Sequence, residues 1–136
     1  MRQILLFALL AASLALLSGY ALSKAKADTA EDMTDKAAYQ KISAEEAYEM
    51  MASQEVVVVD VRTREEYDGG HIENAVLVPN ESIGSEMLEA LPDKEATLLV
   101  YCRSGRRSKD AAQKLLALGY QSVYDFGGVI DWPYEL

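Results

Sequence analysis

The sequence has few of the residues that build disulfides and metal sites. Its 136 residues include one cysteine, Cys102, and one histidine, His71. A single cysteine cannot form an internal disulfide, and a structural zinc site needs about four Cys, His or carboxylate ligands. We therefore expect no disulfide framework, no metal site and no other cofactor.

Basic residues are scarce as well. The chain has 13 Lys and Arg against 22 Asp and Glu, which gives a formal net charge of -9. Proteins that bind nucleic acids generally neutralise phosphates with an excess of basic residues. A nucleic acid is therefore not an expected partner, and the length indicates a single domain with at most a tail.

The first 27 residues have the layout of a secretory signal peptide. A short basic segment, 1–3, precedes an uncharged apolar run, 4–17, and Ala25-Lys26-Ala27 supplies the small-x-small pattern of a cleavage site. The alternative is an uncleaved membrane anchor, because residues 4–22 are just long enough to span a hydrocarbon core of about 30 Å. We expect cleavage, and a periplasmic or secreted protein.

Cleavage at that position would change the distribution of charge. It would leave 109 residues with a net charge of -12, since all the acidic residues lie beyond residue 27. Four of the ten remaining basic residues fall within the eight residues that start at Cys102. We expect residues 28–38 to be a flexible lead-in and residues 39–136 to form the folded domain.

The remaining sequence alternates between strand and helix patterns. Two capping boxes, which begin at Ser43 and Thr63, mark helix starts. Two runs that are apolar on both faces, 56–59 and 97–101, are typical of buried parallel strands. The sequence therefore predicts a small α/β domain with a mainly parallel sheet and helices on both faces. Strands are expected at 39–42, 56–59, 75–78, 97–101 and 123–126, and helices at 44–52, 63–68, 82–91 and 109–118.

Cys102 directly follows one of these strands and precedes a helix. In parallel sheets, ligands bind beyond the carboxyl ends of the strands. The basic segment 103–107 can turn its backbone N–H groups toward one point, and the helix that follows adds the positive end of its dipole. Such surroundings lower the pKa of a thiol, so we predict a nucleophilic thiolate that binds an anion. The alternative is a small buried apolar residue beside a solvated basic surface.

The neighbouring strand ends at Asp60. We expect Asp60 and Arg62 to lie at the same edge of the sheet as Cys102. Asp60 can accept hydrogen bonds from the loop or pair with an arginine, and Arg62 can meet a substrate anion or pair with a glutamate. His71 lies in a turn that enters a strand, and we interpret it as a structural histidine rather than a base for Cys102.

Three motifs, in this order, resemble the single-domain rhodaneses, a family of sulfurtransferases. The first spans residues 60–72 (Asp-Val-Arg, Glu-Glu-Tyr and Gly-His-Ile), the second is the segment 102–108, and the third is Phe-Gly-Gly at 126–128 with a later tryptophan. The resemblance covers about residues 42–132. Together with the signal peptide, the best likeness is to the small periplasmic rhodaneses of bacteria. Asn74 stands where the family often has glycine, and asparagine tolerates the left-handed conformation.

The resemblance implies a rhodanese-like fold and a ping-pong transfer of sulfur. The Cys102 thiolate would attack the outer sulfur of thiosulfate, release sulfite and hold a persulfide, which cyanide or a cellular thiol would then accept. Asp60 and Arg62 would support the rim, the loop arginines would bind the anionic donor, and the protein would be a monomer. The residues that the resemblance assigns to the persulfide cradle are Arg103, Ser104, Gly105, Arg106 and Arg107.

Two other functions stay open at this point. Cys-dependent phosphatases and arsenate reductases have a Cys-x5-Arg motif, with the arginine six positions after the cysteine. In this sequence the sixth position after Cys102 is Ser108, and Arg107 stands at the fifth. A non-catalytic carrier or docking module would bind sulfane sulfur without transferring it. The intact cysteine argues against a carrier, because inert relatives commonly lose it. The basic loop favours thiosulfate over mercaptopyruvate as the donor.

Overall fold

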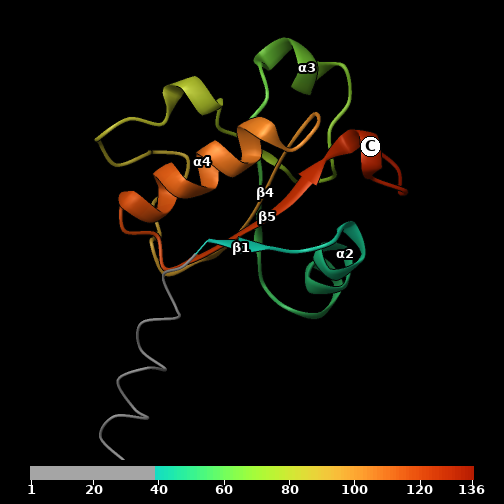
Figure 1. Cartoon of the computed structure of the whole chain (residues 1–136), viewed down its shortest axis with the longest axis horizontal. Coiled ribbons are helices and arrows are strands. Elements are labelled where there is room, and N and C mark those ends of the chain that lie inside the picture. The colour runs from blue at the N-terminus through green and yellow to red at the C-terminus, as the bar shows by residue number, and fades with distance from the viewer. Residues whose placement is uncertain (1–38) are drawn as a thin grey trace, which may run out of the picture. The chain divides into compact units, whose positions relative to one another are not determined.

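A five-stranded, fully parallel sheet forms the centre of the protein (Figure 1). The structure, a computed structural model, describes residues 39–136. The predicted signal peptide, 1–27, and the predicted lead-in, 28–38, lie outside the described residues. Within residues 39–136, no helix has the length and apolar character needed to cross a membrane. In spatial order the strands are β1 (Gln40–Lys41), β5 (Ser122–Gly128), β4 (Thr97–Cys102), β2 (Val57–Asp60) and β3 (Val76–Leu77).

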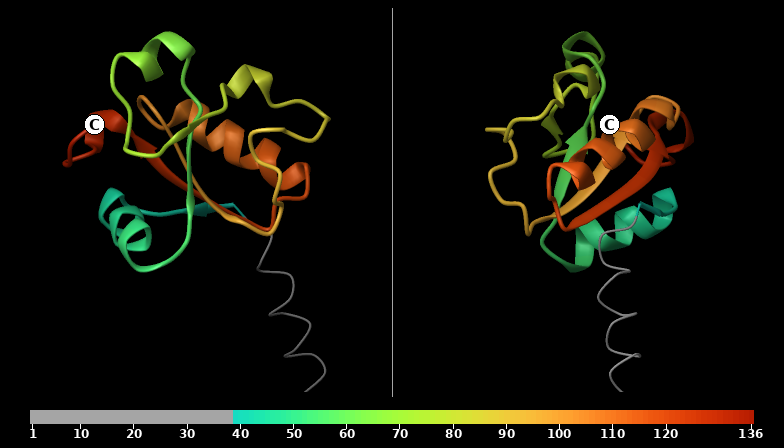
Figure 2. Two further views of the ribbon diagram at one scale, coloured as in Figure 1. Left: turned by 180° about the vertical axis from the view of Figure 1, so that it is seen from behind. Right: turned by 60° about the vertical axis from the view of Figure 1, so that its left-hand side comes forward.

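Helices connect the strands and cover the sheet (Figures 1 and 2). The α-helices are α2 (Ala44–Ser53), α3 (Arg64–Asp68) and α4 (Arg106–Ala117), with single 3-10 turns at η2 (Asn80–Ser82) and η3 (Val129–Asp131). Both predicted capping boxes are present, at the starts of α2 and α3. Helix α4 packs on β4 and β5, while α2 packs on β5 from the other side. The predicted α/β fold class is therefore confirmed.

Successive side chains of β4 divide the core into two parts. Leu98, Val100 and Cys102 join the cluster that contains the apolar face of α4. Leu99 and Tyr101 join the cluster that contains Ala47 of α2 and Trp132. This alternation follows from the two-residue period of a strand, and it places the Cys102 side chain on the α4 side of the sheet.

The helix predicted over 82–91 is wrong. The chain makes only the turn η2 there, and Ile83 then adopts an extended backbone with φ -80° and ψ 103°. Gly84 follows, and a glycine weakens a helix by about 1 kcal/mol relative to alanine. Ile83 and Leu91 are buried at 6% and 2% exposure, but Met87 is 58% exposed. The apolar spacing in this segment therefore reflects separate contacts with the core and not a helical face.

A buried network of polar groups fixes the end of β2. Asp60 is fully buried, and its carboxylate accepts hydrogen bonds from Arg62 Nη2 at 2.7 Å and from the Tyr101 hydroxyl at 2.6 Å. Arg62 Nη2 also donates to the carbonyl of Gly70 at 2.8 Å, and the Ile72 N–H donates to the Tyr101 hydroxyl at 3.1 Å. The network thus ties the turn after α3 to β2 and β4.

We expect Asp60→Asn to destabilise the fold by about 3 kcal/mol or more, because it leaves the buried guanidinium of Arg62 without its counter-charge. Urea unfolding measures this change in free energy. The control is Asp68→Asn at an exposed site, which we expect to change stability by no more than about 0.5 kcal/mol. Equal effects of the two substitutions would contradict the importance of the buried pair.

Candidate active site

The sulfur of Cys102 lies at the end of β4, beneath a three-residue loop, 103–105. Cys102 is a free cysteine and is 1% exposed. The Gly105 N–H donates a hydrogen bond to Sγ at 3.0 Å. Gly105 has φ +99°, a left-handed conformation that glycine adopts without steric cost, and α4 begins at the next residue. Helix α4 starts at Arg106, three residues before the predicted start at residue 109, and its N-terminus is directed at the sulfur.

Hydrogen bonds to the sulfur lower the pKa of Cys102. Burial acts in the opposite direction and is the largest single contribution, but the hydroxyl and N–H of Ser108 and the N–H groups of Gly105 and Ser104 together outweigh it. The single hydroxyl hydrogen of Ser108 also lies within reach of the carbonyls of Gly105, at 3.1 Å, and Gly127, at 3.3 Å. The hydroxyl can therefore donate either to the sulfur or to one of these carbonyls, whereas the backbone N–H groups have fixed directions. We assign to these N–H groups the constant part of the stabilisation of the thiolate.

Strand β5 packs directly against the loop. Its register with β4 shifts by one residue, since Val100 pairs with Asp125 but Cys102 pairs with Gly128. Within this bulge the Gly127 N–H donates to the buried Asp125 carboxylate at 2.9 Å. A Cβ at Gly128 would overlap the backbone of residues 103 and 104. The Phe-Gly-Gly motif therefore permits β5 to approach the loop more closely than any side chain would allow.

The three arginines predicted in the cradle differ in their contacts. Arg107 forms a bidentate ion pair with Glu66 of α3, with Nη1 to Oε2 at 2.8 Å and Nη2 to Oε1 at 2.9 Å. Arg103 and Arg106 are exposed, and neither forms an ion pair within residues 39–136. The structure therefore leaves Arg103 and Arg106 accessible to a bound anion, while it commits Arg107 to α3.

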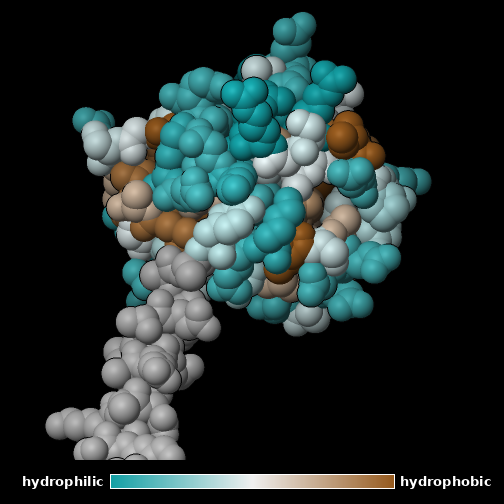
Figure 3. All heavy atoms as spheres, viewed as in Figure 1, coloured by the Kyte–Doolittle hydropathy of each residue, from teal (hydrophilic) through white to brown (hydrophobic). Residues whose placement is uncertain are grey.

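Two open hollows flank the loop. One has a volume of about 350 Å³ and includes Glu66, Arg103 and the exposed side chain of Ile130. The other has a volume of about 680 Å³ and includes Ser104, Arg106 and Arg107. The ion pair between Glu66 and Arg107 lies between the hollows, because each hollow is lined by one of the two partners. Hydrophilic residues gather over the exposed side of α4 (Figure 3).

Asp60 and Arg62 lie at the end of β2, as predicted, but they bond to each other. Arg62 is 5% exposed and its guanidinium binds Asp60 and the Gly70 carbonyl. The partner of Arg62 is therefore Asp60 and not a glutamate, which agrees with the pairing with an arginine that was left open for Asp60. His71 stacks on Tyr67 with 3.7 Å between ring centroids, and its Nδ1 lies 2.9 Å from the Tyr67 carbonyl oxygen. These contacts match the interpretation of His71 as structural.

Two residues of the site have only indirect signals in the sequence. Glu66 was recognised as part of a capping box, but its position 41 residues before Arg107 gives no indication that the two form an ion pair. Ser108 was recognised as part of the loop motif but not as a hydrogen-bond partner of the sulfur. Its signal is a small hydroxyl residue in the first turn of the helix after the cysteine. Within residues 39–136, no group of His, Cys, Asp and Glu is arranged to hold a metal ion.

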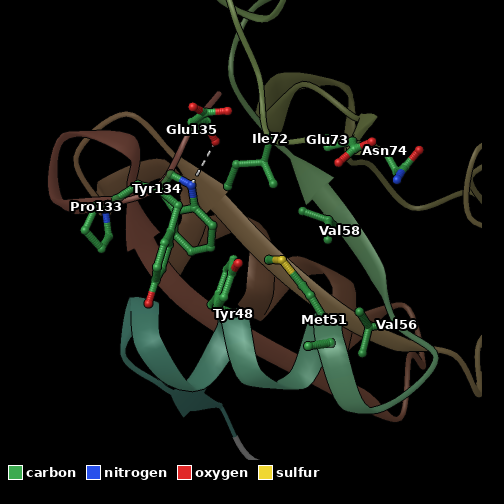
Figure 4. A pocket seen from close by; sticks show the side chains of 12 residues that line it. Tyr48, Met51, Val56, Val58, Ile72, Glu73, Asn74, Pro133, Tyr134 and Glu135 are labelled. Atoms are coloured by element: carbon green, nitrogen blue, oxygen red, sulfur yellow. Dashed lines mark hydrogen bonds between the residues drawn. The ribbon is translucent and has the colours of Figure 1, made fainter.

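A hollow larger than these two lies on the other side of the sheet (Figure 4). It has a volume of about 820 Å³ and is lined by Tyr48 and Met51 of α2 and by Trp132 and Tyr134 near the C-terminal end. Cys102 belongs to the core on the α4 side. This hollow is therefore separate from the thiol and the cationic loop, so we place the candidate active site at the loop.

Comparisons with known proteins place the chain in a family. The rhodanese-like domain family matches residues 43–133. The thiosulfate sulfurtransferase PspE of Escherichia coli (strain K12) is 37% identical over 73 residues, which cover 54% of this chain and 70% of that protein. The structure is similar to that of the human single-domain sulfurtransferase TSTD1, with a TM-score of 0.62 and 26% identity over 70% of this chain and 96% of that one.

A longer relative has a different activity in its name. The tRNA uridine(34) hydroxylase of Hamiltonella defensa subsp. Acyrthosiphon pisum (strain 5AT) is 34% identical over 113 residues, which cover 78% of this chain. This chain spans only 32% of the length of that hydroxylase. The similarity therefore concerns one part of the longer protein.

We expect Gly128→Ala to displace the loop and raise the pKa of Cys102, because the added Cβ overlaps the loop backbone that holds the N–H donors. The rate of alkylation by iodoacetamide as a function of pH measures this pKa, since only the thiolate reacts. Gly84→Ala is the matched control, because nothing lies within 4 Å of a Cβ at Gly84. An unchanged pH profile in Gly128→Ala would refute the role of this close approach.

Proposed function

Because this chain belongs to the rhodanese family, we propose that it is a sulfurtransferase that moves the outer sulfur of thiosulfate to cyanide or a thiol through a persulfide on Cys102. The observation that carries the proposal is the position of the sulfur at the N-terminus of α4, where hydrogen bonds from the Ser108 hydroxyl and from backbone N–H groups lower its pKa against the effect of burial. The exposed Arg103 and Arg106 supply the charge that an anionic donor needs. A monomer suffices for this chemistry.

The first step transfers sulfur to the enzyme. The Cys102 thiolate attacks the outer sulfur of thiosulfate, a new S–S bond forms, and the bond between the two sulfur atoms of thiosulfate breaks. Sulfite leaves with the electron pair of that bond, so the protein becomes a persulfide anion and no external oxidant or reductant is consumed. The N–H groups of the loop, 103–105, and of the first turn of α4 are the donors available to the terminal sulfur.

The second step regenerates the thiolate. Cyanide attacks the terminal sulfur of the persulfide, thiocyanate forms, and the Cys102 thiolate leaves with the electron pair of the S–S bond. A thiolate acceptor reacts in the same way and becomes a persulfide itself. Each acceptor meets the sulfur only after sulfite has left, which is the ping-pong order.

The loop argues against a phosphatase. The sixth position after Cys102 holds Ser108, which is buried and hydrogen-bonded within the loop region, so no guanidinium is present there. The arginine one position earlier, Arg107, is bound on both of its terminal nitrogens by Glu66. The relatives named thiosulfate sulfurtransferase support thiosulfate as the donor. The hydroxylation of tRNA belongs to a relative of which this chain spans only 32%, so we do not propose it here.

We expect Cys102→Ser to abolish the formation of thiocyanate from thiosulfate and cyanide, because a serine hydroxyl cannot form a persulfide. The unsubstituted protein should gain about 32 Da, one sulfur atom, after treatment with thiosulfate, and the serine variant should gain nothing. Mass spectrometry measures the gain, and a thiocyanate assay measures the transfer.

The two alternatives give different results in the same experiment. A carrier would gain the sulfur atom without passing it to cyanide or to a thiol. A phosphatase would hydrolyse a phosphate ester, and Cys102→Ser would abolish that hydrolysis. A protein that neither gains sulfur nor forms thiocyanate would refute the proposed function.

We further propose that residues 1–27 direct the protein to the periplasm, where cleavage releases residues 28–136. The support is the layout of these residues in the sequence. When the full chain is expressed in a Gram-negative bacterium, the periplasmic fraction should contain a protein that begins at Asp28, as N-terminal sequencing will show. Recovery of the uncleaved chain in the membrane fraction would instead support the anchor.

A further inference from the structure

Glu66 takes part in two sets of interactions, the capping box of α3 and an ion pair with Arg107. Its Oε2 accepts hydrogen bonds from the N–H and the hydroxyl of Thr63 at 3.0 and 3.1 Å, which completes the capping box of α3. Both carboxylate oxygens also bind Arg107. The other capping box shows that a cap does not require such a partner: Glu46 accepts a hydrogen bond from the Ser43 N–H at 2.7 Å and forms no ion pair within residues 39–136.

The pair with Glu66 affects the electrostatics at the sulfur. Hydrogen bonding to Glu66 is the largest contribution to the raised pKa of Arg107, and the charge of Cys102 adds to it. Arg107 lies in the first turn of α4 and lines the same hollow as Ser104, so its guanidinium lies beside the loop that covers the sulfur. Both side chains of the pair are 28% exposed, and solvent screens a partly buried pair less than an open surface pair. A carboxylate so placed reduces the positive potential that Arg107 would otherwise create at the loop.

We propose that Glu66 is a specificity-determining residue that neutralises Arg107 and leaves Arg103 and Arg106 as the two cations that meet the sulfur donor. This inference rests on the proposed function, since it concerns the donor of the same site. Two arginines match the charge of a dianion such as thiosulfate. Glu66 thus limits the affinity of the loop for divalent oxyanions without contacting them.

A limit on this affinity serves turnover. The donor and the leaving sulfite are both oxyanions of sulfur that occupy the same loop, and unreactive sulfate has similar charge and shape. A third uncompensated arginine would strengthen binding of all three, and uniform binding lowers KM without raising kcat. The structure places this charge control in α3, outside the loop itself.

The neutralisation is permanent at the pH at which the enzyme works. Hydrogen bonds from Arg107 hold the pKa of Glu66 at about 2, against the opposing effect of burial. The carboxylate remains charged at any pH near neutrality, so the pair does not act as a pH switch. Lys114 and Asp110 on the exposed side of α4 pair with each other. The charge of Glu81 also acts on Arg107, but Glu66 is the carboxylate that forms the ion pair with it.

The test is Glu66→Gln, because glutamine also completes a capping box but carries no charge. We expect the KM for thiosulfate to fall about three- to ten-fold at low ionic strength, and this gain to shrink as salt is added. Sulfite and sulfate should inhibit the variant more strongly by a similar factor, and kcat should not rise. Glu46→Gln makes the same chemical change in the capping box of α2 and should leave these constants unchanged.

A second measurement does not require sulfur transfer. Iodoacetate is an anion and iodoacetamide is neutral, so the ratio of their alkylation rates at Cys102 reports the electrostatic potential at the sulfur. We expect Glu66→Gln to raise this ratio about three-fold or more, and Glu46→Gln to leave it unchanged. An unchanged ratio, or an unchanged or higher KM for thiosulfate, would overturn the inference. If the ratio rises but the unsubstituted protein transfers no sulfur, the proposed function fails and the control of charge stands.

Discussion

The hydrogen bonds that Cys102 Sγ receives from the backbone are the interaction on which the site depends. A buried anion without donors is strongly unfavourable, so a thiolate that is 1% exposed requires N–H groups directed at it. The left-handed Gly105 turns the chain so that α4 begins at the sulfur. The bulge in β5 lies against the loop. Gly128 has no side chain, and this leaves the space that the loop backbone occupies. Several distant segments therefore contribute to the state of one atom.

The charged residues around the site have different roles. The pair of Asp60 and Arg62 is buried and joins secondary-structure elements, whereas the pair of Glu66 and Arg107 is partly buried and lies beside the loop at Cys102. Arg103 and Arg106 stay exposed. In a protein with a formal net charge of -9, this arrangement concentrates positive potential at the loop beside Cys102. The surplus of acidic residues elsewhere does not weaken such a local field at short range.

Local patterns predicted most of the fold, and contacts between distant residues explain what they did not predict. The capping boxes at Ser43 and Thr63 and the apolar strands β2 and β4 depend on neighbours in the sequence, so the sequence was sufficient for them. The helix predicted over 82–91 was wrong because Ile83 and Leu91 are buried by contacts with other elements. The same distinction between local patterns and distant contacts applies to the arginines of the site. Their proximity to Cys102 was evident, but the partner of Arg107 lies in another helix.

The aromatic residues on the α2 side have a spectroscopic consequence. Trp132 is the only tryptophan of the chain, and its ring lies 5.4 Å from that of Phe126, which directly precedes the glycines beneath the loop. The ring of Phe126 in turn lies 5.4 Å from that of Tyr101, the neighbour of Cys102 in β4. Trp132 itself belongs to the core on the side of the sheet away from the sulfur. Its fluorescence emission is therefore an intrinsic, single-site probe of how this face of the sheet responds to a change at Cys102 on the opposite face.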